Sequence, residues 1–150
     1  MYNGLVHAHS GLRWIALILI LVAIVNAMRS QSSGRYEKKD KMINLFAMIM
    51  MHIQLLIGLA LYFMSPKVAF VENWMSSDTA GGMFRFFNVE HIFGMIVAIA
   101  LITVGRSKAE KKLKGTRDKH RRIWINYLVA LIIILVTIPW PFRGFGNGWF

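Results

Sequence analysis

Four long stretches without a charged side chain constrain this chain more than any other feature of its sequence. They are Trp14–Met28, Met42–Pro66, Ile92–Gly105 and Ile123–Phe142. A hydrocarbon core about 30 Å thick requires roughly 20 residues of helix, and the two shorter stretches reach that length with about five residues of their N-terminal flanks. We therefore expect residues 1–150 to form one all-α domain, a four-helix transmembrane bundle. Its spans should cover about residues 9–28, 42–64, 86–105 and 122–141.

The composition is that of an integral membrane protein. Hydrophobic residues make up 56% of the chain and charged residues 17%, with a mean hydropathy of +0.48, which is more apolar than an ordinary soluble domain. Neither a basic N-terminal region nor an A-x-A cleavage site accompanies the first apolar stretch, so we expect no cleaved signal peptide. Cysteine is absent, which excludes covalent c-type haem attachment, cysteine-ligated iron–sulfur clusters and disulfides.

The basic residues are distributed unevenly between the connections. Arg29–Lys41 contains five Lys or Arg and Arg106–Arg122 contains nine, so these two loops hold fourteen of the eighteen in the chain. Basic loops that flank membrane helices stay cytoplasmic. We therefore expect both termini in the periplasm of a bacterial cell and the protein in its inner membrane. The net charge of +11 then reflects loops near anionic lipid headgroups, and no motif indicates a nucleic-acid partner.

Histidines within the spans are the first candidates for a functional site, because ionisable side chains are costly in hydrocarbon. Measured from the basic loops, His52 lies about 16 Å, His91 about 22 Å and His9 about 30 Å from the cytoplasmic boundary. Two histidines at similar depth on facing helices can supply both axial ligands of a b-type haem. We expect His91 to be one ligand and prefer His52 as its partner. His9 stays the alternative, because helix tilt absorbs either depth difference.

Two more residues are candidates for the cofactor site. Gly94, three positions after His91, leaves one side of the helix open for a flat macrocycle. The same glycine, with Ala98 one turn further on, is equally typical of close helix packing. Arg13 lies one turn inside the outer interface beside His9, where it can pair with a haem propionate. The alternative for Arg13 is an arginine that extends its charge to the headgroups.

Four segments of the chain resemble one family of small membrane proteins. They are HAHSGLRW, HIQLLIGLALYFMSP, VEHIFGMIVAIALITVGRSKAEK and KHRRIWINYLVALIIILVTIPWPF. Together they are similar, over nearly the whole chain, to the four-span proteins of Bacteroidetes-type bacteria commonly labelled cytochrome b. The resemblance implies an inner-membrane b-type haem protein that takes part in electron transfer, loosely similar in plan to cytochrome b561 and to respiratory membrane anchors. The chain lacks the evenly spaced histidine pairs of the b561 plan, so the resemblance does not imply a two-haem relay.

Other functions stay open on the sequence alone. Met48, one turn before His52, can join it in a soft Cu(I) site, although methionine also fills membrane cores without a metal. A structural or assembly subunit of a larger respiratory or other membrane complex is a further possibility, with its histidines hydrogen-bonded between helices. No catalytic triad, carboxylate pair or phosphate loop is recognisable. If the protein acts on a substrate, we expect a quinol at the outer face, with His7 or His9, together with Glu90, as proton acceptors.

Overall fold

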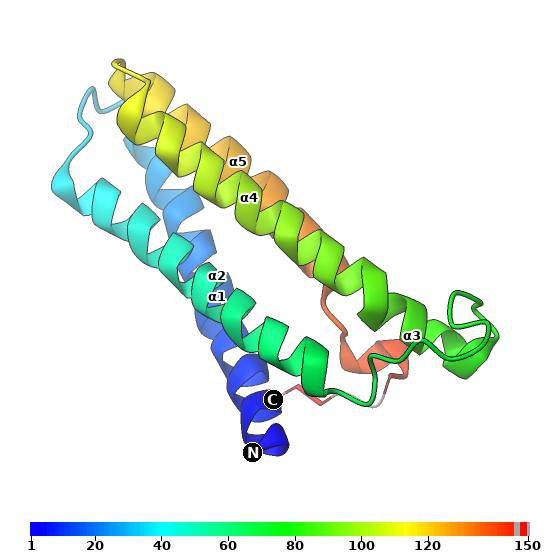
Figure 1. Ribbon diagram of the computed structural model, residues 1–150. Coiled ribbons are helices and arrows are strands. Elements are labelled where there is room, and N and C mark those ends of the chain that lie inside the picture. The colour runs from blue at the N-terminus through cyan, green and yellow to red at the C-terminus, as the bar shows by residue number, and fades with distance from the viewer. Residues whose placement is uncertain (146–147, 150) are drawn as a thin grey trace.

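Four long helices form an antiparallel bundle in the computed structural model, which describes residues 1–145 and 148–149 (Figure 1). The long helices are α1 (Tyr2–Ser30), α2 (Lys38–Met64), α4 (His91–Lys111) and α5 (Thr116–Thr137). The short ones are η1 (Thr79–Gly82), α3 (Met83–Arg85), the π-helical turn η2 (Phe86–Glu90) and η3 (Pro141–Arg143). The described residues contain no strand. The expected all-α class is therefore confirmed.

Each of the four helical segments is long and apolar enough to cross a membrane. The first three segments comprise 29, 27 and 33 residues, and the fourth comprises 22. The third comprises η1, α3, η2 and α4, with a kink within η1 where Ala80 and Gly81 have positive φ. These lengths confirm the four-helix transmembrane bundle and make the chain a multi-pass membrane protein. The helices extend beyond the expected spans at most ends, because a helix can continue into water or headgroups where its side chains are polar.

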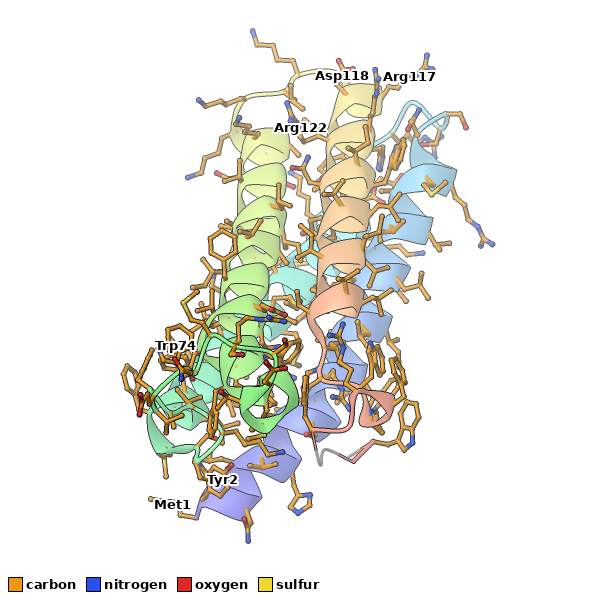
Figure 2. The ribbon with its side chains drawn as sticks, turned by 90° about the vertical axis from the view of Figure 1, so that its right-hand side faces the viewer. Met1, Tyr2, Trp74, Arg117, Asp118 and Arg122 are labelled. Atoms are coloured by element: carbon orange, nitrogen blue, oxygen red, sulfur yellow. The ribbon has the colours of Figure 1, made fainter. Side chains whose placement is uncertain are left out.

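The two ends of the bundle differ in what they carry. Both termini lie at one end, together with the connection between α2 and α4 (Figure 1), and we call this the terminal end. The loops Arg29–Lys41 and Arg106–Arg122 lie at the opposite end, the basic end, where Figure 2 labels Arg117 and Arg122. The arrangement follows from the antiparallel order of the four helices. It separates the fourteen loop cations from the histidines near the chain's start.

Proline and capping residues set the helix limits. α2 begins with a capping box, in which Asp40 accepts a hydrogen bond from the backbone N–H of Glu37 and the Glu37 side chain caps the helix in return,. α2 and α5 both end two residues before a proline. Ser65 and Ile138, the residues immediately before those prolines, are extended, as the following pyrrolidine ring requires. α5 therefore ends at Thr137, four residues short of the expected limit.

Small residues bring α4 and α5 into close contact along their length. A Cβ atom added to Gly94 would lie 2.5 Å from Cγ2 of Thr137, and one added to Gly105 would lie 2.7 Å from Cβ of Asn126. α1 packs against both α2 and α5, whereas α2 and α4 make the least contact of the neighbouring pairs. The core is a chain of alanine and isoleucine side chains that includes Ile20, Ile102 and Ile123. The seam between α2 and α4 is consequently the loosest part of the bundle.

Candidate functional site

A cavity lies between the helices at the terminal end. α1, α2 and α4 form its walls, and the end of α5 closes one side with Ile134 and Ile138. Its lining on α1 runs from Tyr2 to Leu17, about 22 Å along the helix axis. Most of the remaining lining is aliphatic. The polar side chains that line the cavity are Tyr2, His9, Ser10, Arg13, Gln54, Tyr62, Ser65, Lys67 and His91.

His9 of α1 and His91 of α4 lie next to each other at this cavity. Their ring centroids are 6.4 Å apart and the ring planes make an angle of 79°. An imidazole nitrogen binds a first-row metal ion at about 2 Å, so two imidazoles on opposite sides of one metal have centroids about 6 Å apart. The two rings are therefore close enough for one metal ion to be held between them.

The end of α5 fixes the orientation of His91. Pro139 and Pro141 have no N–H group, so the carbonyls of Leu135 and Thr137 lose the donors that a continuing helix would supply. Side chains replace those donors: Trp140 Nε1 donates to the Leu135 carbonyl at 2.8 Å, and His91 Nδ1 donates to the Thr137 carbonyl at 2.7 Å. Because a carbonyl can only accept, Nδ1 of His91 carries the proton and Nε2 is the free ligand nitrogen of the neutral ring.

His9 is held against α2 at a position that has no side chain. A Cβ atom added to Gly58 would lie 3.3 Å from Cε1 of His9, so only glycine leaves full room for this ring. Gln54, one turn earlier on α2, donates from Nε2 to the His9 carbonyl at 3.1 Å. The Nδ1 atom of His9 is buried and has no hydrogen-bond partner among the described residues. A buried imidazole nitrogen that has no hydrogen-bond partner, on a side chain that lines a cavity, is available to bind a metal ion.

Arg13 lines the same cavity and also contacts the C-terminal segment. Its Nη2 donates to the carbonyl of Trp149 at 2.7 Å, and its guanidinium lies over the rings of Trp14 and Trp140 at 5.5 and 5.7 Å. Trp14 donates to the same carbonyl at 3.0 Å. The Nε atom of Arg13 is buried without a partner among the residues that the structure describes. Arg13 thus lies at the cavity, close to His9 in sequence, and its visible partner is the C-terminal backbone.

The other predicted site residues lie away from the cavity lining. His52 is partly buried on α2, and its Nδ1 donates to the carbonyl of Met48 in its own helix at 2.8 Å. Gly94 is buried against Thr137, which is the close-packing alternative raised for that residue. Glu90 is exposed and pairs with Arg85 at 2.7 Å. The structure brings His91 together with His9, and does not bring His52 to the same cavity.

Several residues of the site were not predicted from the sequence. Lys67, Gln54 and Gly58 line the cavity, and the Thr137 carbonyl orients His91. Gln54 and Gly58 are spaced one turn apart on α2, together with Met51, so a helical projection places them on one face. The two prolines that follow Thr137 indicate that carbonyls in the last turn of α5 lack their helical N–H donors. Lys67 gave no signal beyond its place among the few cations outside the basic loops.

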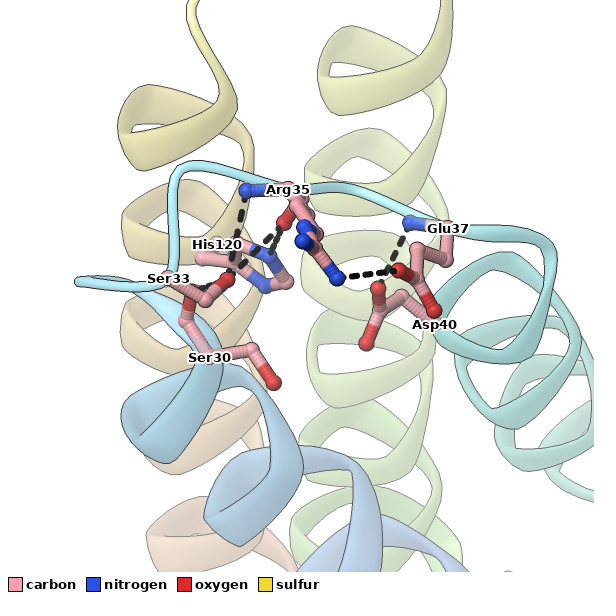
Figure 3. A network of polar contacts seen from close by, with 6 residues as sticks. All are labelled: Ser30, Ser33, Arg35, Glu37, Asp40 and His120. Carbon is pink, nitrogen blue, oxygen red and sulfur yellow. Dashed lines mark hydrogen bonds and ion pairs between the residues drawn. The ribbon is translucent and has the colours of Figure 1, made fainter.

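A polar network closes the basic end. Tyr36 donates to Glu110 at 2.6 Å, Asn44 donates to the Tyr36 hydroxyl at 3.3 Å, and Tyr127 donates to the Asn44 carbonyl at 2.8 Å. His120 is fully buried, and its Nε2 donates to the carbonyl of Arg35 at 2.8 Å (Figure 3). The network links the α1–α2 loop to α2, α4 and α5.

The donor set at the cavity fits a b-type haem. Its two imidazoles are too few for a closed tetrahedral zinc site, and the described residues contain no group of three His, Cys, Asp or Glu placed to hold a metal ion. Two histidines at an apolar, elongated cavity would, by contrast, be sufficient to hold a haem iron, which would supply one-electron redox chemistry,. Comparison with protein-family models, curated proteins and solved structures found no match to the chain. A functional assignment therefore rests on this geometry.

Proposed function

We propose that the protein is a b-type haem protein of the bacterial inner membrane that takes part in electron transfer, with His9 and His91 as the axial ligands. The 6.4 Å separation of the two imidazole rings at an apolar cavity carries the proposal. Haem bound there would supply a centre that accepts and releases one electron. The resemblance noted in the sequence points to the same chemistry.

The chain's own residues prepare the site for such a ligand. The hydrogen bond from His91 to the Thr137 carbonyl fixes the ring and its tautomer, and it makes the free nitrogen a stronger base. The lining is mostly aliphatic, so the field of each charge at the site is felt more strongly than in solvent. Arg13 places a positive charge at the cavity, which favours an electron-rich, reduced state over an oxidised, more positive one.

The proposal includes an orientation and an electron donor. From the distribution of basic residues we place the terminal end in the periplasm, and we expect a quinol of the membrane pool to be the electron donor at that end. Glu90 is exposed and bound to Arg85, and His7 is exposed. His9 is a haem ligand in this proposal, so the exposed His7 and Glu90 are the remaining candidates for the proton acceptor. A periplasm-active reporter fused after Phe150 should be active, and the same reporter inserted in Lys108–Lys114 should be inactive.

Absorption spectroscopy of the purified full-length protein tests the haem site. Protein expressed with ample haem should contain one haem per chain and show the spectrum of a six-coordinate, low-spin iron. His9→Ala and His91→Ala should each lose haem or convert it to a five-coordinate form. His52→Ala is the matched control and should keep the wild-type spectrum.

Three results would contradict parts of this proposal. A colourless preparation would remove the haem function, and metal analysis would then separate a copper protein from a structural subunit. Loss of haem in His52→Ala, with retention in His9→Ala, would restore His52 as the partner of His91. Activity of the reporter within Lys108–Lys114 would reverse the orientation.

A further inference from the structure

Two buried polar atoms on neighbouring residues of α1 and α2 have no hydrogen-bond partner among the described residues. They are Nδ1 of His9 and Oε1 of Gln54. Both residues line the cavity, and Gln54 is only 8% exposed. The two residues are in direct contact, because Gln54 Nε2 donates to the His9 carbonyl at 3.1 Å. Most buried polar atoms in proteins are hydrogen-bonded, so two that are not, side by side at one proposed ligand, indicate a functional role.

The position of the His9 ring distinguishes its two nitrogens. A Cβ atom added to Gly58, one turn after Gln54 on α2, would lie 3.3 Å from Cε1 and 3.9 Å from Nδ1 of His9. Nδ1 therefore belongs to the edge of the ring that faces α2, and it is enclosed there. Nε2 lies more than 4 Å from the same point. It is consequently the nitrogen that the packing leaves for a ligand in the cavity.

The two unmatched atoms are chemically complementary. A neutral imidazole carries its proton on one nitrogen and binds a metal through the other, so a ring that binds through Nε2 has an N–H at Nδ1. The amide oxygen of Gln54 can only accept a hydrogen bond. His91 already shows the same arrangement, because its Nδ1 donates to the Thr137 carbonyl at 2.7 Å. Histidines that bind metals almost always donate their other N–H to an acceptor of this kind.

We propose that Gln54 is the positioning residue of His9, which donates from Nδ1 to the Gln54 amide oxygen when its Nε2 binds a metal. This inference rests on the proposed haem function, with haem iron as the metal. The bond from Gln54 Nε2 to the His9 carbonyl already holds the amide beside this residue, and the pair closes by rotation of the side chains. Gln54 then does for His9 what the Thr137 carbonyl does for His91, and both ligands bind through Nε2.

Two substitutions of Gln54 separate its acceptor from its donor. Gln54→Glu keeps an acceptor oxygen and loses the amide donor, whereas Gln54→Met is similar in length and loses both. Gln54→Met should bind haem about 10–100-fold more weakly than the wild type. It should also raise the midpoint potential, because a less basic ligand stabilises oxidised iron less. Gln54→Glu should restore most of the affinity and return the potential to the wild-type value or below it.

The matched control is the other glutamine of the chain, at the basic end. Gln31 accepts a hydrogen bond from Nε1 of Trp124 at 2.6 Å, and Gln31→Met should change neither haem affinity nor midpoint potential. Thermal melting of each purified full-length variant shows whether it is folded. Unchanged affinity and potential in Gln54→Met would overturn the proposal. The same conclusion would follow if Gln54→Glu were as impaired as Gln54→Met, because the lost bond to the His9 carbonyl would then explain both variants.

Nitrogen-15 NMR of labelled histidine rings tests the pair in the wild type. Low-spin iron(II) is diamagnetic, so in the reduced protein both ligands should show a protonated Nδ1 and an iron-bound Nε2. An iron-bound Nδ1 would overturn the role of Gln54 and leave the haem function intact. If the wild type binds no haem, the haem function fails, and the spectrum is recorded with Zn²⁺ and assigned with His9→Ala. Zinc on Nε2 of His9, with the proton on Nδ1, would support the pair. Zinc on Nδ1, or no zinc at His9, would overturn it.

Discussion

His91 and His120 stand at opposite ends of the bundle and make the same kind of bond, yet their surroundings differ completely. Each ring donates one N–H to a backbone carbonyl, His91 to Thr137 at 2.7 Å and His120 to Arg35 at 2.8 Å. The ring of His120 is fully buried and packs edge-on against the ring of Tyr36, with the two ring centroids 5.0 Å apart. His91 instead lines a cavity and has the second imidazole, His9, beside it.

The difference separates a structural histidine from a candidate ligand. At the basic end, polar side chains bond to one another across four elements and leave His120 no open space. At the terminal end, His91 is held by the helix-end carbonyl of Thr137 and also lines the cavity. A histidine inside a membrane span therefore indicates a ligand site only when the packing leaves its second nitrogen facing an open cavity. The first nitrogen is satisfied in both cases.

The largest effect should separate the two histidines themselves. His91→Ala should lower haem affinity by more than about 100-fold, since even the partners that orient a ligating histidine are worth about 10–100-fold. His120→Ala should keep its haem and lower the free energy of unfolding by about 1–3 kcal/mol, because it removes a fully buried ring together with its hydrogen bond to the Arg35 carbonyl,. Haem titration and thermal melting of both variants measure this. Haem loss in His120→Ala would remove the distinction between the two ends.

A second pair of substitutions tests the contact between α4 and α5 at each end. Gly94→Ala and Gly105→Ala both force a methyl group against α5, and each should destabilise the fold by about 1–3 kcal/mol through overpacking. Only Gly94→Ala moves the Thr137 carbonyl that orients His91, so it alone should weaken haem binding, by about tenfold. Equal haem affinity in the two variants would mean that the Thr137 bond does not position the ligand.

A smaller effect is expected from the wall of α2 that faces His9. Gly58→Ala places a methyl group 3.3 Å from the His9 ring, whereas a methyl group on Gly11 has no neighbour within 4 Å. Both changes raise helix propensity by about 1 kcal/mol, so neither variant should melt at a lower temperature than the wild type. Gly58→Ala should nevertheless bind haem a few-fold more weakly, and Gly11→Ala should bind it normally. Identical binding curves would argue against His9 as a ligand.

The smallest effect concerns the basic end and its dependence on pH. Burial, together with the hydrogen bond to Glu110, raises the pKa of Tyr36. A raised pKa means that the folded state favours the neutral hydroxyl, so this stabilisation is complete below the ordinary tyrosine pKa of about 10 and declines as the pH rises above it. Tyr36→Phe should lower the free energy of unfolding by about 0.5–1.5 kcal/mol at neutral pH. Denaturation at several pH values should show the gap to the wild type narrowing above about pH 10, with haem binding unaffected throughout.

The sequence by itself determined the class and the number of helices. Four uncharged stretches of sufficient length lead to four helices in hydrocarbon, because every backbone N–H and C=O must be bonded within the segment there. Pro66 and Pro139 set the ends of α2 and α5 for an equally local reason, since proline restricts the residue before it. The candidate residues His9, His91 and Arg13 were also accessible from the sequence, because a polar side chain within an apolar span is conspicuous wherever it points.

The tertiary structure decided which of those residues meet. Depth along a helix is a local quantity of about 1.5 Å per residue, and on that measure His52 and His9 were nearly equal partners for His91. Each successive residue turns by about 100° around the helix axis, so the face that α2 presents inward depends on packing. Met51, Gln54 and Gly58 line the cavity, and His52 does not.

Gly94 and Gly105 set the approach of α4 to α5, and only that approach brings His91 to the Thr137 carbonyl and to His9. Helix rotation and tilt are properties of the whole bundle, which is why no single segment of the sequence could reveal the pair.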